Sequence, residues 1–388
     1  MDKIADAFSL IRNGANIKQG LDDSGYPITR IETISNRTVD RDKMGYAGIT
    51  DITKYSDYVL QDGDILMSHI NSETHLGKVA RYEKYEGETI IHGMNLLCLR
   101  PNKNLVDSRY AFYYLSSEAF LHQIPRITKK SVNQASFNVA ALKELTFPIS
   151  SMEVQQPVAD ILDKANELIA LRKEQLAKLD ELIKARFVEM FGDMILNPNS
   201  WEKVDLGTVC DVRDGTHDSP KYFAEGIPLV TSRNLSSGRI DFTDCNLICE
   251  ADYNKINERS KVDLGDILMP MIGTVGNPII VDIDAEFAIK NVALIKFSEN
   301  SKVVNVFVKA LLESDYFDRA VLDKVRGGTQ QFISLGDIRR LNVCLPPLEV
   351  QKQFAAFVTQ ADKSRVAVQK ALDEAQLLFD SLMQKYFG

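Results

Sequence analysis

Apolar residues recur about every 3.5 positions in two long stretches of the chain, Glu153–Gly192 and Glu349–Gly388. Such a stripe is typical of a long helix whose apolar face is buried against another helix. Two helices that each follow their own domain within a single chain are expected to pair antiparallel. We therefore predict two long antiparallel helices that form a coiled-coil-like spacer. The stripe of the first stretch comprises Val154, Val158, Ile161, Ala165, Leu168, Arg172, Gln175, Leu179, Leu182, Arg186 and Val188–Phe191, and it is widened by Leu162, Ile169, Leu176 and Ile183.

The two stretches are copies of each other. They align without a gap at an offset of 196 residues, with nine of forty positions identical, and both open on Glu-Val-Gln and close on Phe-Gly. The similarity extends upstream, because Asn133–Gln156 matches Thr329–Lys352 at the same offset. We infer two units in tandem, each a globular segment followed by a long helix. The predicted bounds are 1–150 for the first globular domain, 151–192 for the first helix, 193–347 for the second domain and 348–388 for the second helix.

Short apolar runs within the globular segments are bounded by Gly, Pro or Asn and are typical of strands. Helical spacing is present in Arg109–Ile124 and Val304–Val325. Each globular segment is thus a mixture of helix and strand, either α+β or α/β, and we predict α+β. The predicted strands are Gly63–Ser68, Asn95–Arg100, Asp266–Met271 and Asn291–Phe297.

Composition narrows the class of protein. The 388 residues are 45% hydrophobic and 26% charged, as in globular proteins of two or three domains. There is no apolar run of eighteen residues and no secretory pattern at the N-terminus, so we expect no membrane span and a cytoplasmic location. Five cysteines without framework spacing are expected to be reduced thiols. The net charge of −8 argues against non-specific coating of nucleic acid, although a small basic face would still bind phosphate.

Motifs that mark an enzyme are absent from the sequence. It has no Walker-type phosphate loop, no His-Glu-x-x-His zinc motif, no paired Cys-x-x-Cys and no Asn-Pro-Pro-Tyr-type tetrapeptide. Cys245 and Cys249 have no matching pair and no nearby histidine, so we interpret them as structural. We therefore expect neither catalytic residues nor a metal site in this chain.

A polar and basic segment occupies the same position in both units, at 126–134 and at 324–331. Lys and Arg neutralise phosphates, Asn and Gln pair with adenine edges, and Gly lets backbone amides approach a phosphate. A basic run is ordinarily a solvated face, but its recurrence favours a binding role. His217 lies in a further polar loop, Asp214–Pro220, which faces either a ligand or solvent. The candidate DNA contacts are Arg126, Lys129, Lys130, Ser131, Asn133, Gln134, Thr216, His217, Ser232, Arg233, Asn234, Arg326, Gly327, Thr329, Gln330 and Gln331.

On these features the chain resembles the specificity subunits of type I restriction-modification systems. The resemblance is carried by Leu145–Gln156 (LTFPISSMEVQQ) and Leu341–Lys352 (LNVCLPPLEVQK), and by the Phe-Gly ends of both long stretches. The repeated Gly-Asp-Ile-Leu-Met run supports it, as does Trp201–Val209 (WEKVDLGTV), which is similar to the opening of a second recognition domain in that family. The first unit departs from the pattern, because Ile4–Asn13 lacks that Trp and Leu-Gly opening.

The resemblance implies two target-recognition domains that each read half of a bipartite, asymmetric sequence in double-stranded DNA. It further implies that the helices set the unread spacer and dock two methyltransferase subunits, which bind S-adenosylmethionine. Restriction subunits, which use ATP with Mg, would complete the assembly, so no cofactor is expected in this chain. Two other interpretations stay open: a non-enzymatic coiled-coil scaffold with protein-binding heads, and a silent recognition allele.

Overall fold

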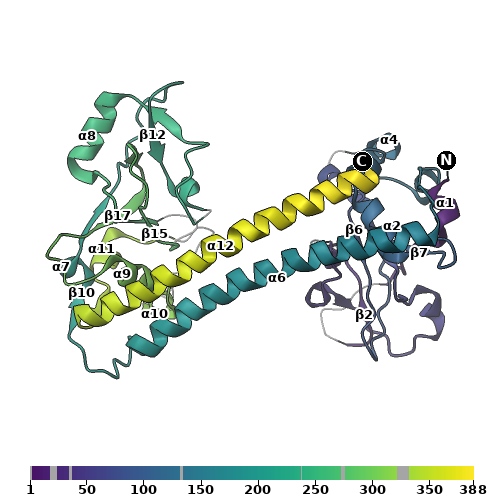
Figure 1. The fold of residues 1–388 in the computed structure, drawn as a ribbon, viewed down its shortest axis with the longest axis horizontal. Coiled ribbons are helices and arrows are strands. Elements are labelled where there is room, and N and C mark those ends of the chain that lie inside the picture. The colour runs from purple at the N-terminus through teal and green to yellow at the C-terminus, as the bar shows by residue number, and fades with distance from the viewer. Residues whose placement is uncertain are drawn as a thin grey trace. The chain divides into compact units, whose positions relative to one another are not determined.

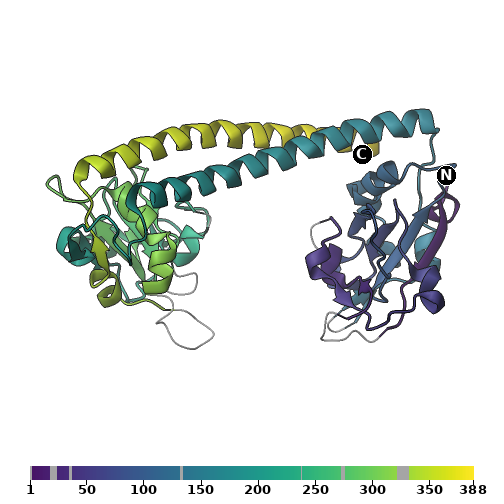
Figure 2. The same ribbon diagram turned by 90° about the horizontal axis from the view of Figure 1, so that it is seen from below.

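The structure is a computed structural model that describes residues 2–17, 24–34, 37–131, 134–236, 238–271, 276–320 and 332–388. The chain divides into two compact units (Figure 1). Unit 1 comprises Met1–Lys173 together with Lys370–Gly388, and unit 2 comprises Glu174–Gln369. Each unit therefore contains one globular domain and one segment of each long helix, and these helix segments lie along one side of the domain (Figure 2).

The two globular domains share a central four-stranded antiparallel sheet. Its order is β1-β7-β4-β6 in unit 1 and β11-β17-β14-β15 in unit 2. Every residue of the central strands β4 and β14 is buried, as the apolar Ile-Leu-Met runs predict. The strands are β1 (Phe8–Asn13), β7 (Leu96–Pro101), β4 (Ile65–Ser68), β6 (Val79–Arg81), β11 (Asp211–Asp214), β17 (Val292–Lys296), β14 (Ile267–Pro270) and β15 (Ile279–Ile280).

The turn before each central strand is also repeated. Gly63 and Gly265 have φ of 86° and 87°, a conformation that favours glycine over residues with a side chain. The next residue in each unit, Asp64 or Asp266, is a buried aspartate with a cationic partner on the neighbouring strand. That partner is Arg100 for Asp64, at 2.8 Å, and Lys296 for Asp266, at 2.5 Å. The conserved geometry of a buried ion pair confirms that the Gly-Asp-Ile-Leu-Met runs occupy equivalent places.

Smaller sheets and short helices complete each domain. Unit 1 adds β2 (Pro27–Ile28) with β3 (Gly45–Tyr46), the sheet β5 (Ile70–Asn71), β9 (Ala135–Ser136) and β8 (Lys129–Lys130), the helices α1 (Ile4–Ala7), α2 (Ser108–Ser116), α3 (Glu118–Leu121), α4 (Ile124–Ile127) and α5 (Val139–Lys143), and the 3-10 turns η1 (Ile31–Ile34), η2 (Arg41–Lys43), η3 (Thr53–Tyr58) and η4 (Glu73–His75). Unit 2 adds β10 (Lys203–Asp205) with β18 (Asn342–Cys344), the sheet β13 (Asn246–Ile248), β12 (Ile227–Val230) and β16 (Ala288–Ile289), the helices α7 (Leu206–Val209), α8 (Glu250–Ser260), α9 (Asn305–Leu312), α10 (Asp315–Ala320) and α11 (Leu335–Arg339), and η5 (Ser232–Leu235).

Both predicted mid-domain helices are interrupted. Within Arg109–Ile124, α2 ends at Ser116, and the side chain of Ser117 then accepts a hydrogen bond from Phe120 N at the start of α3. A serine that caps a new helix ends the preceding one, which helical spacing alone does not reveal. In Val304–Val325, α9 is followed by α10, and the part of the prediction beyond Ala320 lies outside the described residues.

The two long helices are α6 (Met152–Phe191) and α12 (Leu348–Phe387), of forty residues each. α6 begins in unit 1 and ends in unit 2, whereas α12 begins in unit 2 and ends in unit 1, so the helices are antiparallel. At its Phe-Gly end, α12 contributes Phe387 to the core of unit 1, with its ring 5.1 Å from that of Tyr110. Phe191 of α6 lies equivalently in unit 2, 4.9 Å from Phe307.

A buried glutamine joins each long helix to its domain. Gln155 is completely buried; its Oε1 accepts from Asp107 N at 2.9 Å, and its Nε2 donates to the carbonyls of Leu105 and Ser150. Gln351, also completely buried, makes the same three kinds of hydrogen bond with Val304 N and with the carbonyls of Lys302 and Pro346. These are the glutamines of the repeated Glu-Val-Gln motif, so the motif has a structural role in both units.

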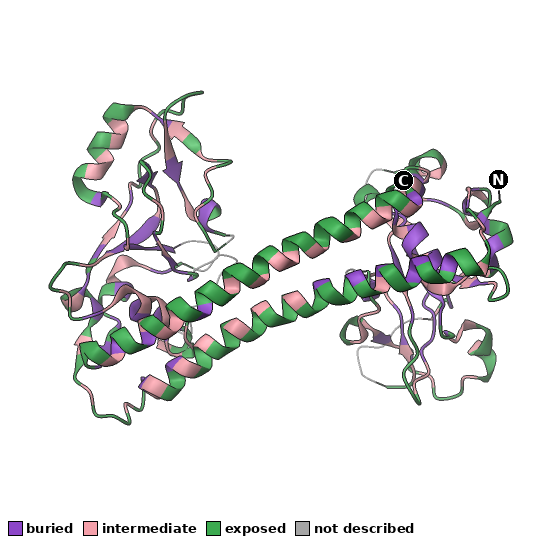
Figure 3. Cartoon of the chain, in the orientation of Figure 1, coloured by how far each residue is buried: buried purple, intermediate pink, exposed green. Residues whose placement is uncertain are grey.

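The predicted apolar seam of α6 is only half correct. Val158 and Ala165 are buried, but Val154, Ile161 and Leu168 are 52%, 41% and 44% exposed. The buried face also contains Ala159 and two of the residues predicted to widen the stripe, Leu162 and Ile169; Ala159 and Leu162 belong to the core of unit 1. The reason is that the globular domain covers this face. Val154, Ile161 and Leu168 remain as an exposed apolar row at seven-residue spacing, on a helix that is exposed along much of its length (Figure 3).

Candidate nucleic-acid interface

The small sheet of unit 1 carries the first group of candidate contacts. β8 is its edge strand, and the side chains of Lys129 and Lys130 on it are exposed. The N–H and the hydroxyl of Ser131 both donate to the carbonyl of Gln134, at 2.8 and 2.7 Å, and thereby close the hairpin between β8 and β9. Gln134 is exposed beside this closure. The hairpin thus presents two lysines and one amide side chain to solvent.

Positive charge is concentrated in this segment. Arg126 is exposed on α4, directly before β8, while Ile124 of the same helix is buried in the core. Lys130 Nζ lies 2.6 Å from a carboxylate oxygen of Glu73 on η4. Both of these side chains are more than half exposed, so the ion pair contributes little to stability and exchanges readily for another anion.

The residue that follows this hairpin and the residue at the matching place in unit 2 make the same kind of backbone hydrogen bond. Phe137 N donates to the carbonyl of His69, just after β4, at 3.1 Å. Ile333 N donates to the carbonyl of Met271, just after β14, at 3.0 Å, and both Phe137 and Ile333 are buried. The polar and basic segment that recurs in both units is therefore followed by equivalent backbone positions. Six candidate residues of this segment lie outside the described residues: Asn133, Arg326, Gly327, Thr329, Gln330 and Gln331.

Thr216 and His217 lie in a loop held tightly against the sheet of unit 2. Gly215 precedes them at a place where a side chain is excluded, because a Cβ there would lie 2.2 Å from the carbonyl oxygen of Ile289. Thr216 forms a parallel bridge with Lys290. The backbone of the loop is therefore fixed, and the side chain of His217 projects from it with 63% of its surface exposed.

Both ring nitrogens of His217 face oxygen atoms. Nδ1 lies 2.8 Å from Asn291 Oδ1, and Nε2 lies 2.6 Å from Asp214 Oδ2. The hydrogen bonds to Asn291 and Asp214 raise the pKa of His217 above its ordinary value. Asp214 is shared, because its other oxygen accepts from the guanidinium of Arg259 on α8. The loop thus joins residues that are distant in sequence into one polar cluster.

The third group of candidates lies on η5. Arg233 is exposed, and its guanidinium donates to the carbonyl of Asp244 at 3.0 Å. Asn234 is buried; its Oδ1 accepts from the N–H and hydroxyl of Thr231, and its Nδ2 donates to the carbonyl of Asp241. We therefore keep Ser232 and Arg233 as candidate contacts and assign Asn234 the role of holding η5 in shape.

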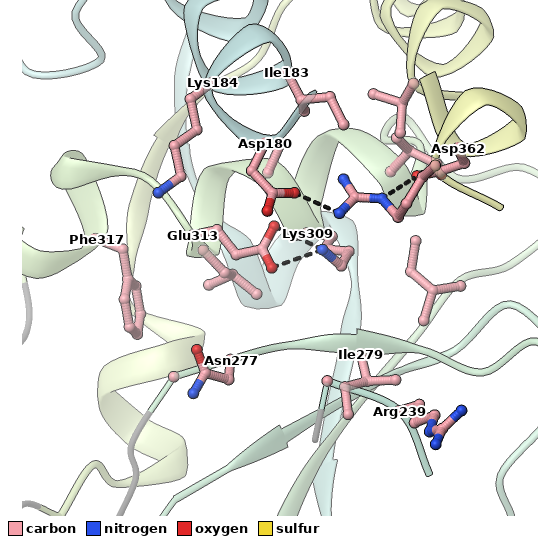
Figure 4. Close-up of a pocket in the computed structure, with 18 of the residues that line it drawn as sticks. Asp180, Ile183, Lys184, Arg239, Asn277, Ile279, Lys309, Glu313, Phe317 and Asp362 are labelled. Carbon is pink, nitrogen blue, oxygen red and sulfur yellow. Dashed lines mark hydrogen bonds and ion pairs between the residues drawn. The ribbon is translucent and has the colours of Figure 1, made fainter. Parts of the chain in front are cut away.

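A cavity of about 860 Å³ lies within unit 2 between α9, β15 and the segments of α6 and α12 (Figure 4). Five of its charged residues pair with one another. Arg365 bridges Asp180 and Asp362, at 2.6 and 3.4 Å, and Lys309 pairs with Glu313 at 2.6 Å. Acidic side chains outnumber basic ones in its lining, which disfavours a phosphate ligand.

The described part of the chain contains no group of three or more His, Cys, Asp or Glu side chains that could hold a metal ion. Among the same residues, no helix is both long and apolar enough to span a membrane.

The family described as "Type I restriction modification DNA specificity domain" matches the chain twice, over residues 2–181 and 198–375. The chain belongs to this family. A putative type I restriction enzyme specificity subunit, MjaX of Methanocaldococcus jannaschii, is 34% identical over 374 residues, which cover 93% of this chain and 86% of that protein. The specificity subunit of the EcoBI enzyme of Escherichia coli is 22% identical over 71% of this chain and 64% of its own length.

A solved structure supports the architecture. The crystal structure of the type I S subunit from M. genitalium has a TM-score of 0.59 and covers all of this chain and 95% of its own, at 17% identity. The chain is thus a specificity subunit with two recognition domains and two long antiparallel helices. Specificity subunits are the DNA-recognition component of a type I complex and act with other subunits, rather than as the catalytic component.

The candidate residues predicted from the sequence of this specificity subunit include the loop and the hairpin but none of α8. Lys255 and Arg259 lie beside Thr216 and His217 along one groove. Arg259 is 45 residues away from Asp214, with which it pairs, and no local motif marks it. Composition does not mark it either, because the exposed positions of α8 include Glu250 and Glu258 as well as Lys255 and Arg259.

Proposed function

We propose that each recognition domain reads one half of a bipartite DNA target, and that the long helices set the length of the unread spacer and dock two methyltransferase subunits. One observation carries the proposal. The same four-stranded sheet, the same ion pair of a buried aspartate and the same glutamine hydrogen bonds occur twice in one chain, while the exposed polar segments differ. A shared scaffold with different surfaces supports two different half-sites and hence an asymmetric target.

The proposed contacts of the first domain are on the hairpin of unit 1. Arg126, Lys129 and Lys130 supply positive charge for phosphates, and Gln134 supplies an amide that can pair with a base edge. In the second domain, the proposed contacts are Thr216, His217, Ser232 and Arg233. Asn133, Arg326, Gly327, Thr329, Gln330 and Gln331 belong to the proposal through their residue types and position in the sequence.

The exposed apolar row of α6 supports docking of a partner. Val154, Ile161 and Leu168 recur every seven residues, as the residues of a helix–helix seam do. Burial of such a row by a helix of another subunit would remove apolar surface from water, which is the dominant favourable term in association. In the proposed complex, methyltransferase subunits supply the S-adenosylmethionine site and restriction subunits supply the site for ATP with Mg. A cytoplasmic location stays a prediction.

The test is a methylome of cells that co-express this chain with its modification subunit. N6-methyladenine confined to one split motif, and lost when this chain is omitted, is the expected result and would define both half-sites. The matched control is the chain with Val154, Ile161 and Leu168 replaced by Ser, which should lose assembly and methylation together. A soluble complex that produces no new methylation would contradict the proposal and would favour a scaffold with protein-binding heads.

A further inference from the structure

A groove of about 400 Å³ separates the loop 216–220 from helix α8 in unit 2. The apolar side of α8 packs through Tyr253 and Ile256 on the sheet β13-β12-β16. Its other side leaves Lys255 and Arg259 exposed along the groove. The two walls therefore come from different parts of the chain, and both are anchored to sheets.

Three basic side chains line this groove, and a fourth stands beside its loop. Lys255 and Arg259 come from α8, His217 comes from the loop, and Lys290 stands beside the loop with its Nζ 2.6 Å from Ser219 Oγ. Three carboxylates are close to them: Asp214, Asp218 and Asp252. Positive charge is thus in excess here, in a chain whose net charge is −8, whereas the cavity of Figure 4 has an excess of acids.

The charge of His217 follows from its surroundings. Each ring nitrogen faces an oxygen, on Asp214 or Asn291, and an imidazole satisfies two acceptors only when both nitrogens carry hydrogen. The hydrogen bonds to Asn291 and Asp214 support the charge, burial and Arg259 oppose it, and the balance raises the pKa of His217. Asn291, which presents its Oδ1 to His217, has a backbone φ of 54°, a conformation that is uncommon for residues other than glycine.

The carboxylate of Asp214 is only 14% exposed and lies behind the cations rather than in front of them. It is shared between His217 and Arg259, whose side chains are 63% and 64% exposed. Both N–H groups of His217 are used within the cluster, so its positive charge acts on a nearby anion without a direct hydrogen bond. Arg259 keeps donors that face solvent, and an anionic oxygen in the groove would accept charge-assisted hydrogen bonds from Arg259 and Lys255, which are stronger than neutral ones.

We propose that this groove binds a backbone phosphate of the DNA beside the second half-site, with Lys255 and Arg259 as its hydrogen-bonding contacts and the positive charge of His217 beside them. The proposal rests on the proposed function, since it presumes that unit 2 faces DNA. It assigns to the second domain a phosphate contact that the first does not share. In the described part of unit 1, the segment at the place of α8 is the six-residue turn η3, and Asn16 follows the bridge of Ala15 with Gly93 where His217 follows that of Thr216.

The proposal predicts a particular dependence on pH. His217 is cationic below its raised pKa and neutral above it, so its share of the affinity is present at low pH and is lost as the pH rises through that pKa. The wild-type chain should therefore bind DNA less tightly as pH rises from about 6 to about 8.5.

The experiment measures binding of the full chain, in complex with its methyltransferase subunits, to a duplex that contains its methylated motif. Fluorescence anisotropy is recorded from about pH 6 to about 8.5 at several salt concentrations. His217→Gln should weaken binding at low pH roughly tenfold and remove the pH dependence, and His217→Lys should restore affinity at every pH. Arg259→Ala should reduce the slope of log K against log salt by about one.

Arg319→Ala is the matched control, because Arg319 is a half-exposed arginine of unit 2 that pairs with Asp193 outside the groove. If the His217 and Arg259 variants behave like this control in affinity, salt slope and pH profile while still binding the motif, the phosphate site is wrong and the proposed function stands. If the wild-type complex shows no preference for any DNA, the proposed function fails as well.

Discussion

Replacement of Gln155 by alanine should destabilise unit 1 through a mechanism that can be followed bond by bond. Gln155 is completely buried and makes three hydrogen bonds, all to backbone groups. Truncation leaves one N–H, that of Asp107, and two carbonyls, those of Leu105 and Ser150, without their partner. At roughly 1 kcal/mol for each bond, the loss is about 3 kcal/mol. For a unit of this size, that corresponds to a fall in melting temperature on the order of 10 °C.

The assay combines calorimetry with amide hydrogen exchange. Calorimetry measures the fall in the unfolding temperature of unit 1, and exchange of the peptide that contains Asp107 reports the loss of the hydrogen bond to Gln155 Oε1. Gln156→Ala is a demanding control, because Gln156 is the adjacent glutamine on the same helix and is exposed. Gln351→Ala should reproduce the effect in unit 2, with the exposed Lys352→Ala as its control. A Gln155→Ala variant as stable as Gln156→Ala would refute the reasoning that these amides hold the helices to the domains.

Three further predictions concern DNA affinity, spacer length and acid stability. Lys129→Ala should weaken binding to all sequences and reduce the salt slope by about one, whereas Lys143→Ala, an exposed lysine on α5, should not; equal slopes in titrations would remove Lys129 from the interface. Insertion of four residues into each of α6 and α12 adds about 6 Å of helix, and the methylome should then show a spacer longer by about two base pairs; an unchanged spacer would show that the helices do not set it. Arg41 lowers the pKa of Glu88 to about 2, so Glu88 contributes stability above its ordinary pKa that is lost as pH falls toward 2. Urea unfolding of Glu88→Gln should therefore show a deficit on the order of 2 kcal/mol at pH 7 that vanishes near pH 2; a deficit independent of pH would contradict this assignment.

The tandem fold was accessible from the sequence because its signals are local. The Gly-Asp-Ile-Leu-Met runs give β4 and β14, and a seven-residue apolar period over forty residues gives α6 and α12. The predicted stripe of α6 was too wide, because it held both the exposed Ile161 and Leu168 and the buried Leu162 and Ile169, and a periodic pattern does not show which of two adjacent apolar rows faces the domain. That choice depends on the packing of α2, a contact between distant segments.

The candidate site was accessible only in part for the same reason. The basic hairpin and the His217 loop have a recognisable composition, so residue types alone pointed to them. Asn234 has the same polar character, but its amide is used inside the domain. Arg259 and Asn291 become neighbours of the loop only through the fold, and Asn291 is 74 residues away from the histidine that it contacts. Contacts at such separations leave no periodicity in the chain.

The long helices lead the chain from unit 1 to unit 2 and back to unit 1, so the chain returns to the unit in which it began. Lys3 bridges Thr146 and Phe387 packs against Tyr110, so the two ends of the described chain belong to the same unit. In unit 2, the corresponding junction is the continuous segment between Phe191 and Trp201, whose rings are in contact. A circular permutant, joined at the first junction and opened at the second, would keep every packing contact described above. The order in which the halves are encoded is therefore independent of the arrangement that they form, and gene duplication of a self-pairing half-length ancestor is a direct route to it.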